Sequence, residues 1–199
     1  MKLSKDFYLR EDVVQISKDL LGKFLLTNID GVISGGMIVE TEAYCAPDDR
    51  ASHAFNNKKT DRTKTMFMEG GISYVYLCYG IHHLFNVVTN IEEIPHAILI
   101  RAIEPTDGIE TLLRRRNMDK LEKRIAAGPG AMSKALGIGK LHNALSLESD
   151  QVWIEDRGLL INRNQIMAST RVGVDYAGED AKLPWRFRIK NNPFVSKAK

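Results

Sequence analysis

Several features that would assign a protein to a class at once are scarce in this 199-residue sequence. Its two cysteines, Cys45 and Cys78, lie far apart, which excludes a disulfide framework and a four-cysteine zinc site. No run approaches the ~20 apolar residues that cross a bilayer, and charges interrupt the N-terminal segment before an apolar block of signal length. These absences predict a protein of the reducing cell interior, located in the cytoplasm and without contact to a membrane.

Charge of one sign is also lacking, because the net charge is +3 and the pI is about 8.8. A basic coat for nucleic acid is therefore absent, although one concentrated patch is still allowed. No GxxxxGK[ST] loop or HExxH motif occurs, so neither a nucleoside triphosphatase nor a recognised metal site is expected. A metal-dependent hydrolase stays an unsupported alternative, with these possible ligands: Glu40, Glu42, Asp48, Asp49, His53, His82 and His83.

The remaining composition, 44% hydrophobic and 27% charged, is typical of a globular protein, and the length suits one domain over residues 1–199. The patterns predict helices over 11–20, over 107–124 with Asp107 as a possible cap, and after the turn in GPGAMSKALGIG. Strands are predicted around Asp30-Gly31 and in GISYVYLCYG, HHLFNVVTN and HAILIRAIEP. The tail from about Gln151, with VWIED, TRVGVDYAG and PWRFRIK, is expected to be mostly strands and loops. We therefore expect an α+β fold, a single domain with a curved antiparallel β core and surrounding helices.

One segment, IVETEAYCAPDDRASH at 38–53, places two carboxylates in an apolar strand pattern. Alternation along a strand gives Glu40, Glu42 and Tyr44 a common face. A buried unpaired carboxylate is costly, so this face needs partners, water or a ligand. The alternative is an edge strand with a solvated acidic face.

A second segment, YVYLCYGIHHLFN at 74–86, is rich in tyrosine. Tyr74 and Tyr76 share a strand face, and Tyr79 lies at the turn that ends the strand. Such rings can stack on a flat heterocycle, and base–aromatic stacking contributes ~1–3 kcal/mol per base. A tyrosine-rich core strand is the alternative.

Basic residues gather in KKTDRTKT, which holds Lys58, Lys59, Arg62 and Lys64, and in RRRNMDKLEKR at 114–124. Either segment could contact phosphate, although a charged helix is more often a solvated face. Arg101 lies among apolar residues, so it needs a carboxylate partner, for which Glu42 and Glu104 are the candidates. A purely structural ion pair would explain it equally well.

Taken together, these motifs resemble those of the alkyladenine (3-methyladenine, or methylpurine) DNA glycosylase family. The resemblance rests on IVETEAY, on His53 nine residues after Tyr44, on MFM at 66–68, and on YVYLCYG, Asn86, LIRAIEP, RVGV and PWRFRI. These motifs follow the family order from about residue 20 to the end. The combination of IVETEAY with YVYxxYG is highly specific.

The resemblance implies a role for each matching position. Glu42 corresponds to the general base that deprotonates the attacking water, while Arg101 and the backbone carbonyl of Val172 hold that water. The residues that surround the flipped base are Tyr44, His53, Tyr76 and Asn86, of which Asn86 disfavours the 2-amino group of guanine. Tyr79 corresponds to the wedge that enters the DNA, and Lys58, Arg62 and Lys64 are expected at its backbone.

The implied reaction is hydrolysis of the N-glycosidic bond of a damaged purine in double-stranded DNA, without a cofactor. A carboxylate can activate water and stabilise positive charge on the sugar, and extrusion of the base costs a few kcal/mol. The expected enzyme is a monofunctional, monomeric, compact bacterial form acting at the nucleoid in base excision repair, with Glu40 as a structural partner. His82 replaces an aromatic tyrosine of vertebrate members, which leaves contacts beside the wedge open.

Two alternatives of other classes remain. GPGAMSKALGIG has a superficial likeness to a helix–hairpin–helix glycosylase, which would need a catalytic aspartate such as Asp150 or Asp156. A non-catalytic damaged-DNA-binding module would use the tyrosines as a platform and leave Glu42 without a chemical role.

Overall fold

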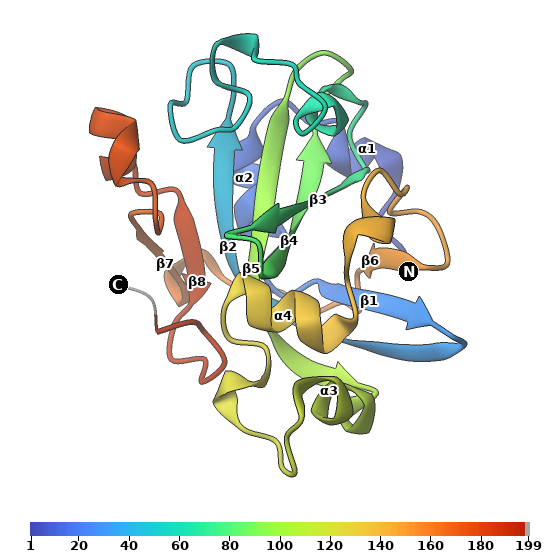
Figure 1. Cartoon of the computed structure of the whole chain (residues 1–199). Coiled ribbons are helices and arrows are strands. Elements are labelled where there is room, and N and C mark those ends of the chain that lie inside the picture. Colours follow the sequence, from blue (N-terminus) through green and yellow to red (C-terminus); the bar gives the residue numbers. More distant parts are fainter. Residues whose placement is uncertain (198–199) are drawn as a thin grey trace.

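A computed structural model describes residues 1–197, which form one α+β domain (Figure 1). The strands are β1 Phe24–Ile29, β2 Val32–Cys45, β3 Ser73–Cys78, β4 His82–Thr89, β5 His96–Asp107, β6 Val152–Glu155, β7 Ile166–Ser169 and β8 Arg186–Ile189. The α-helices are α1 Lys5–Tyr8, α2 Val13–Asp19, α3 Ile109–Arg116 and α4 Pro129–Leu136. Short 3-10 turns include η1 Phe55–Asn57, η2 Lys64–Phe67, η3 Lys123–Ile125, η4 Lys140–His142, η5 Arg163–Gln165 and η6 Asp175–Lys182.

The strands of the described residues join in one antiparallel sheet, ordered β3-β4-β5-β2-β1-β6, with β8 pairing both β2 and β7. The predicted fold class is thereby confirmed. Strand β2 pairs with β1, β5 and β8, so it lies at the centre of the sheet. The alternative of a solvated edge strand for Glu40 and Glu42 is wrong, because both side chains are fully buried.

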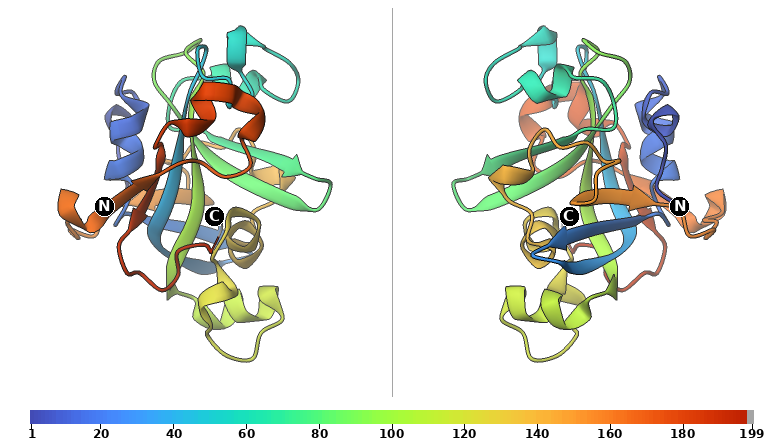
Figure 2. Two further views of the ribbon diagram at one scale, coloured as in Figure 1. Left: turned by 90° about the vertical axis from the view of Figure 1, so that its left-hand side faces the viewer. Right: turned by 90° about the vertical axis from the view of Figure 1, so that its right-hand side faces the viewer.

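Two hairpin turns use residues with positive φ, which suits the twist of antiparallel strands. Asp30 and Gly31, at φ 55° and 75°, join β1 to β2 as the sequence predicted. Tyr79 and Gly80, at φ 50° and 72°, join β3 to β4. This second hairpin projects from the long strands β2 and β5 (Figure 2), and it leaves Tyr79 89% exposed at its tip.

Helices cover both faces of the sheet (Figures 1 and 2). Helix α2 packs on β2 from one face, where the Ser17 carbonyl accepts a hydrogen bond from the Thr41 hydroxyl at 2.9 Å. Helix α4 packs on β4 and β5 from the other face. Thr41 faces α2, whereas Glu40 and Glu42 contact residues of the opposite side, so the alternation expected along β2 holds. No helix within residues 1–197 is long and apolar enough to span a membrane.

One predicted element differs in the structure. The helix expected over 107–124 is confined to α3, because β5 continues to Asp107 and Asn117 adopts a left-handed conformation at φ 51°. Asp107 does not cap the helix; its carboxylate accepts hydrogen bonds from Arg157. TRVGVDYAG, in the tail expected to consist mostly of strands and loops, forms no strand and leads into η6.

Candidate active site

A cavity of about 660 Å³ opens between the β3–β4 hairpin, the loop that precedes it, the start of α4 and the segment before η6. This volume is within the usual range for a small-molecule site. Eight of the predicted site residues line it, namely Tyr44, His53, Arg62, Tyr76, Tyr79, Asn86, Arg101 and Val172. Lys58 and Lys64 do not line it and are exposed on the preceding loop.

Glu42 does not line the cavity, but its carboxylate contacts three residues that do. Its Oε2 accepts a hydrogen bond from the Tyr44 hydroxyl at 2.9 Å. Its Oε1 accepts one from the backbone N–H of Val172 at 2.9 Å and lies 3.2 Å from Nη1 of Arg101. The N–H of Val172 thus contacts Glu42, while the role expected for its carbonyl, to hold the attacking water, stays a prediction. These three donors hold the carboxylate in one position.

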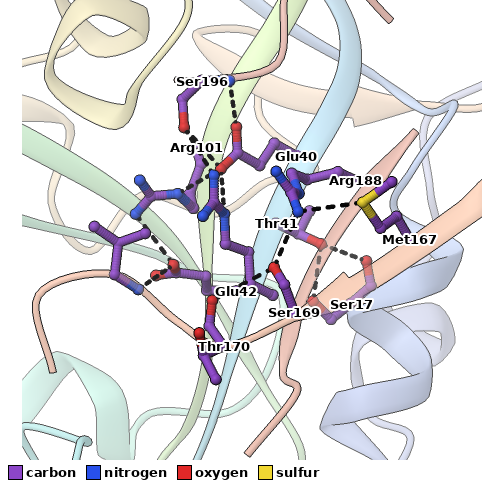
Figure 3. A network of polar contacts seen from close by, with 12 residues as sticks. Ser17, Glu40, Thr41, Glu42, Arg101, Met167, Ser169, Thr170, Arg188 and Ser196 are labelled. Carbon is purple, nitrogen blue, oxygen red and sulfur yellow. Dashed lines mark hydrogen bonds and ion pairs between the residues drawn. The ribbon is translucent and has the colours of Figure 1, made fainter. Parts of the chain in front are cut away.

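Glu40 is held by a different set of donors on the same side of β2 (Figure 3). Its carboxylate accepts hydrogen bonds from Nε of Arg101 and Nε of Arg186, both at 2.8 Å, and from the N–H and hydroxyl of Ser196 at 2.7 and 2.9 Å. Burial alone would raise the pKa of Glu40, but these positive charges and the Ser196 N–H outweigh it and lower that pKa. Arg101 therefore bridges both glutamates.

The predicted partners of Arg101 included Glu42 and Glu104. Of these two candidates, Glu42 contacts Arg101 and Glu104 does not. The Glu104 carboxylate accepts a hydrogen bond from the Asn192 amide at 2.6 Å instead. The pairing of β2 with β5 shifts register on both sides of Glu40. Such bulges re-aim side chains next to active sites.

The aromatic wall of the cavity is built on β3 and on the loop before it. The rings of His53 and Tyr76 meet edge to face at 4.7 Å, and those of Tyr74 and Tyr76 lie 5.4 Å apart. Nδ1 of His53 is 3.1 Å from the Tyr74 hydroxyl. Burial, followed by the positive charge of Arg62, lowers the pKa of His53 to about 4, so its imidazole is neutral at pH 7. Asn86 is fixed by a hydrogen bond from its amide to the Tyr74 carbonyl at 3.1 Å.

Arg171 is a site residue that sequence reasoning missed. Its Nη2 donates to Oδ1 of Asp49 at 2.8 Å, and its guanidinium lies 4.8 Å from the Tyr44 ring centroid and 5.2 Å from that of Trp185. The Arg171–Asp49 ion pair is buried. Because this pair holds the guanidinium in place, the guanidinium supports the Tyr44 ring from behind. The signal available in the sequence was an arginine directly before Val172, at the start of the RVGV motif.

The glycine-rich turn before α4 forms part of the cavity wall through residues 128–131. A Cβ on Gly130 would lie 2.7 Å from Cγ of His82, so only glycine lets α4 approach the hairpin this closely. The aspartates required by a helix–hairpin–helix enzyme lie elsewhere: Asp150 pairs with Lys2, and Asp156 pairs with Lys23. Neither lines the cavity.

The possible metal ligands named from the sequence do not converge. Within residues 1–197, no three histidine, cysteine, aspartate or glutamate side chains gather closely enough to hold a metal ion. Glu40 and Glu42 face arginines, and Asp49 faces Arg171. The groups that converge on the cavity are instead aromatic rings, guanidinium groups and one buried carboxylate behind them.

Fold and site together define a class: a single-domain α+β protein with an aromatic cavity backed by a fixed carboxylate. The sequence model of the methylpurine-DNA glycosylase family matches residues 6–193. The chain belongs to this family. The fold, the enzyme class and the family expected from the sequence are confirmed: the chain is a DNA glycosylase, a hydrolase that acts on N-glycosyl bonds in DNA repair.

Close relatives cover nearly the whole chain. A protein of Chlamydia pneumoniae named "Putative 3-methyladenine DNA glycosylase" is 45% identical over 188 residues, 94% of each chain. Proteins of the same name from Clostridium perfringens and Bacillus cereus are each 42% identical over an alignment of 205 positions, which covers 99% of this chain and 100% of theirs.

Proposed function

We propose that the chain is a monofunctional glycosylase that extrudes alkylated or deaminated purines from duplex DNA and hydrolyses their N-glycosidic bond with a water activated by Glu42. The observation that carries this proposal is the position of Glu42, whose carboxylate contacts Tyr44, Arg101 and Val172 at the back of the cavity. A base in that cavity would place its sugar near a buried negative charge. Such a charge activates water and stabilises a cationic sugar in the transition state.

The aromatic wall supports a site for the extruded base. Tyr44, His53 and Tyr76 present rings to one cavity. Electron-rich ring faces attract a purine that alkylation has made cationic. Asn86, fixed at the same wall, is assigned to exclusion of the guanine 2-amino group.

The tip of the β3–β4 hairpin supports a wedge role for Tyr79. The side chain is exposed on a tight turn and next to the cavity, so it can fill the gap that an extruded base leaves in the stack. The exposed lysines Lys58 and Lys64, together with Arg62, are assigned to the phosphates on either side of the lesion.

The remaining assignments complete the proposal. Residues 1–199 act as one glycosylase domain, which works as a monomer because a lesion in one strand offers no twofold symmetry. No cofactor is required. The bacterial origin of the relatives supports action at the nucleoid.

The test is single-turnover release of one ethenoadenine or hypoxanthine from a duplex, and of methylated bases from genomic DNA, with EDTA present. We expect wild type to release base and Glu42→Gln to lose about 10²–10⁴-fold in rate, the usual contribution of a general base. Glu104→Gln is the matched control, because its carboxylate lies on β5, outside the cavity, and bonds Asn192.

Other outcomes would redirect the assignment. Lesion binding without release by wild type would indicate a damage-binding module. Equal rates for wild type and Glu42→Gln would remove Glu42 as the base, and inhibition by EDTA would require a metal. Strand cleavage without heat or alkali would contradict a monofunctional enzyme.

A further inference from the structure

Arg101 is held from two sides by the two glutamates of β2 (Figure 3). Its Nε donates a hydrogen bond to Oε1 of Glu40 at 2.8 Å, whereas its Nη1 lies 3.2 Å from Oε1 of Glu42. Both glutamates are fully buried and Arg101 is 5% exposed. Within residues 1–197, no other carboxylate lies within ion-pair distance of Arg101. The balance between these two carboxylates therefore sets the position of the guanidinium.

Glu40 is held by three donors besides Arg101. Nε of Arg186 donates to it at 2.8 Å, and the N–H and hydroxyl of Ser196 donate at 2.7 and 2.9 Å. These donors come from β8 and from the C-terminal segment, so the Glu40 carboxylate keeps its place when the guanidinium of Arg101 shifts. Glu40 is therefore a fixed support, and the shorter of the two contacts of Arg101 is made with it.

Glu40 and Ser196 lie outside the cavity, whereas Arg101 lines it. Neither of the first two residues can touch a base that occupies the cavity. Ser196 contacts Glu40, and Glu40 contacts the guanidinium of Arg101. These contacts give both residues a route to the cavity through that guanidinium.

We propose that Glu40 and Ser196 are positioning residues for base excision, which hold Arg101 on the Glu40 side so that the Glu42 carboxylate stays available for the proton of the attacking water. This inference rests on the proposed function, in which Glu42 is the base, and adds two residues to it. If Glu40 loses its charge, Glu42 becomes the only carboxylate beside Arg101. Guanidinium and carboxylate groups form pairs with two parallel hydrogen bonds. Such a pair would occupy the oxygens that take up the proton and would draw Arg101 away from the water that it is expected to hold.

The first experiment compares Glu40→Gln with Glu104→Gln in single-turnover release of ethenoadenine or hypoxanthine from a duplex, with increasing enzyme in excess of DNA. We expect Glu40→Gln to lower the rate at saturating enzyme about 10- to 100-fold, because a shift of about 1 Å in a positioned group has effects of this size. The enzyme concentration that gives half of the maximal rate should stay that of wild type, since Glu40 does not line the cavity. Glu104→Gln removes a carboxylate from β5 that accepts a hydrogen bond from Asn192, and it should keep the wild-type rate.

This design separates positioning from a loss of folded protein. A purely structural defect lowers the fraction of active enzyme, which raises the concentration for half of the maximal rate and leaves the saturated rate unchanged. A double-mutant cycle gives a second criterion. If Glu40 acts through Arg101, Glu40→Gln slows the wild type but adds no further loss to Arg101→Met. Equal factors in the two backgrounds would overturn the proposal.

Ser196→Ala tests the same relation without a change of charge. Alanine removes the hydroxyl that donates to Oε1 of Glu40 but keeps the backbone N–H that donates to Oε2. We expect the saturated rate to fall about two- to fivefold, the effect of one hydrogen bond, and the loss to vanish in Arg101→Met. Ser149→Ala is the control, because it removes a hydroxyl that bonds the Val152 carbonyl outside the cavity. Equal rates in the two serine variants would overturn the role of Ser196.

The outcomes keep this inference apart from the proposed function. If wild type releases no base, base excision itself fails and the inference fails with it. If wild type releases base, Glu42→Gln does not, and Glu40→Gln matches Glu104→Gln at saturating enzyme, the proposed function stands. Only the positioning role of Glu40 and Ser196 is then overturned.

Discussion

His53 makes the free energy of unfolding depend on pH, and a substitution at this position isolates its contribution from those of the other titratable groups. Its pKa falls from 6.5 to about 4 on folding. Between these values the unfolded chain binds a proton that the folded protein excludes, so the stabilisation present above pH 6.5 is lost as the pH falls toward 4. We expect the free energy of unfolding, measured in urea from pH 7 to pH 4, to fall less steeply in His53→Gln than in wild type. Parallel slopes would show that His53 titrates alike in both states.

Residue types and strand alternation were enough to select most of the side chains that line the cavity. Glu40 and Glu42 share a face, as their spacing of two requires, and Tyr79 lies at an exposed turn. The contacts between distant segments could not be predicted in the same way. Arg62 lies over Tyr76 and Ser196 bonds Glu40 because the fold brings them together, and no local pattern encodes such pairs.

Helix α2 offers an element whose stability depends on one cap. The carboxylate of Asp12 accepts a hydrogen bond from the N–H of Gln15 at 2.9 Å, which satisfies one of the free donors of the first turn. Asp12→Ala should lower the free energy of unfolding by about 1 kcal/mol, whereas Asp12→Asn should be close to wild type because asparagine caps equally well. Equal losses in both variants would assign the effect of Asp12 to its charge.

Elements that begin or end at a turn with glycine were predicted correctly. The Asp30-Gly31 hairpin and the helix after Gly128 both follow from residues that allow positive φ. The predicted helix over 107–124 was too long, because helix-forming side chains continue past Asn117 while the backbone there turns left-handed. The segment at 170–174 has strand-like residues but no neighbouring strand with which to pair, since Arg171 and Val172 bond Asp49 and Glu42 instead.

At the scale of the whole molecule, one carboxylate joins segments that are far apart in the sequence. Glu40 lies on β2, Arg101 on β5 and Arg186 on β8, and Ser196 comes from the C-terminal segment, 156 residues away. Register shifts around Glu40 let Arg101 reach both glutamates. The ion-pair network behind the site therefore exists only in the assembled sheet.

This network makes Glu40 the position at which a small change should affect the whole fold. Glu40→Gln keeps the shape of the side chain but leaves Arg101 and Arg186 buried with less compensating charge, so we expect a loss of about 3–5 kcal/mol in the free energy of unfolding. Glu104→Gln removes the same charge at a position where the carboxylate accepts a hydrogen bond from Asn192, and it should cost about 1 kcal/mol. Urea unfolding of both variants, followed by fluorescence and circular dichroism, gives the two values. Similar losses in the two variants would mean that Arg101 and Arg186 find other partners, and the stability of the fold would then not depend on the charge of Glu40.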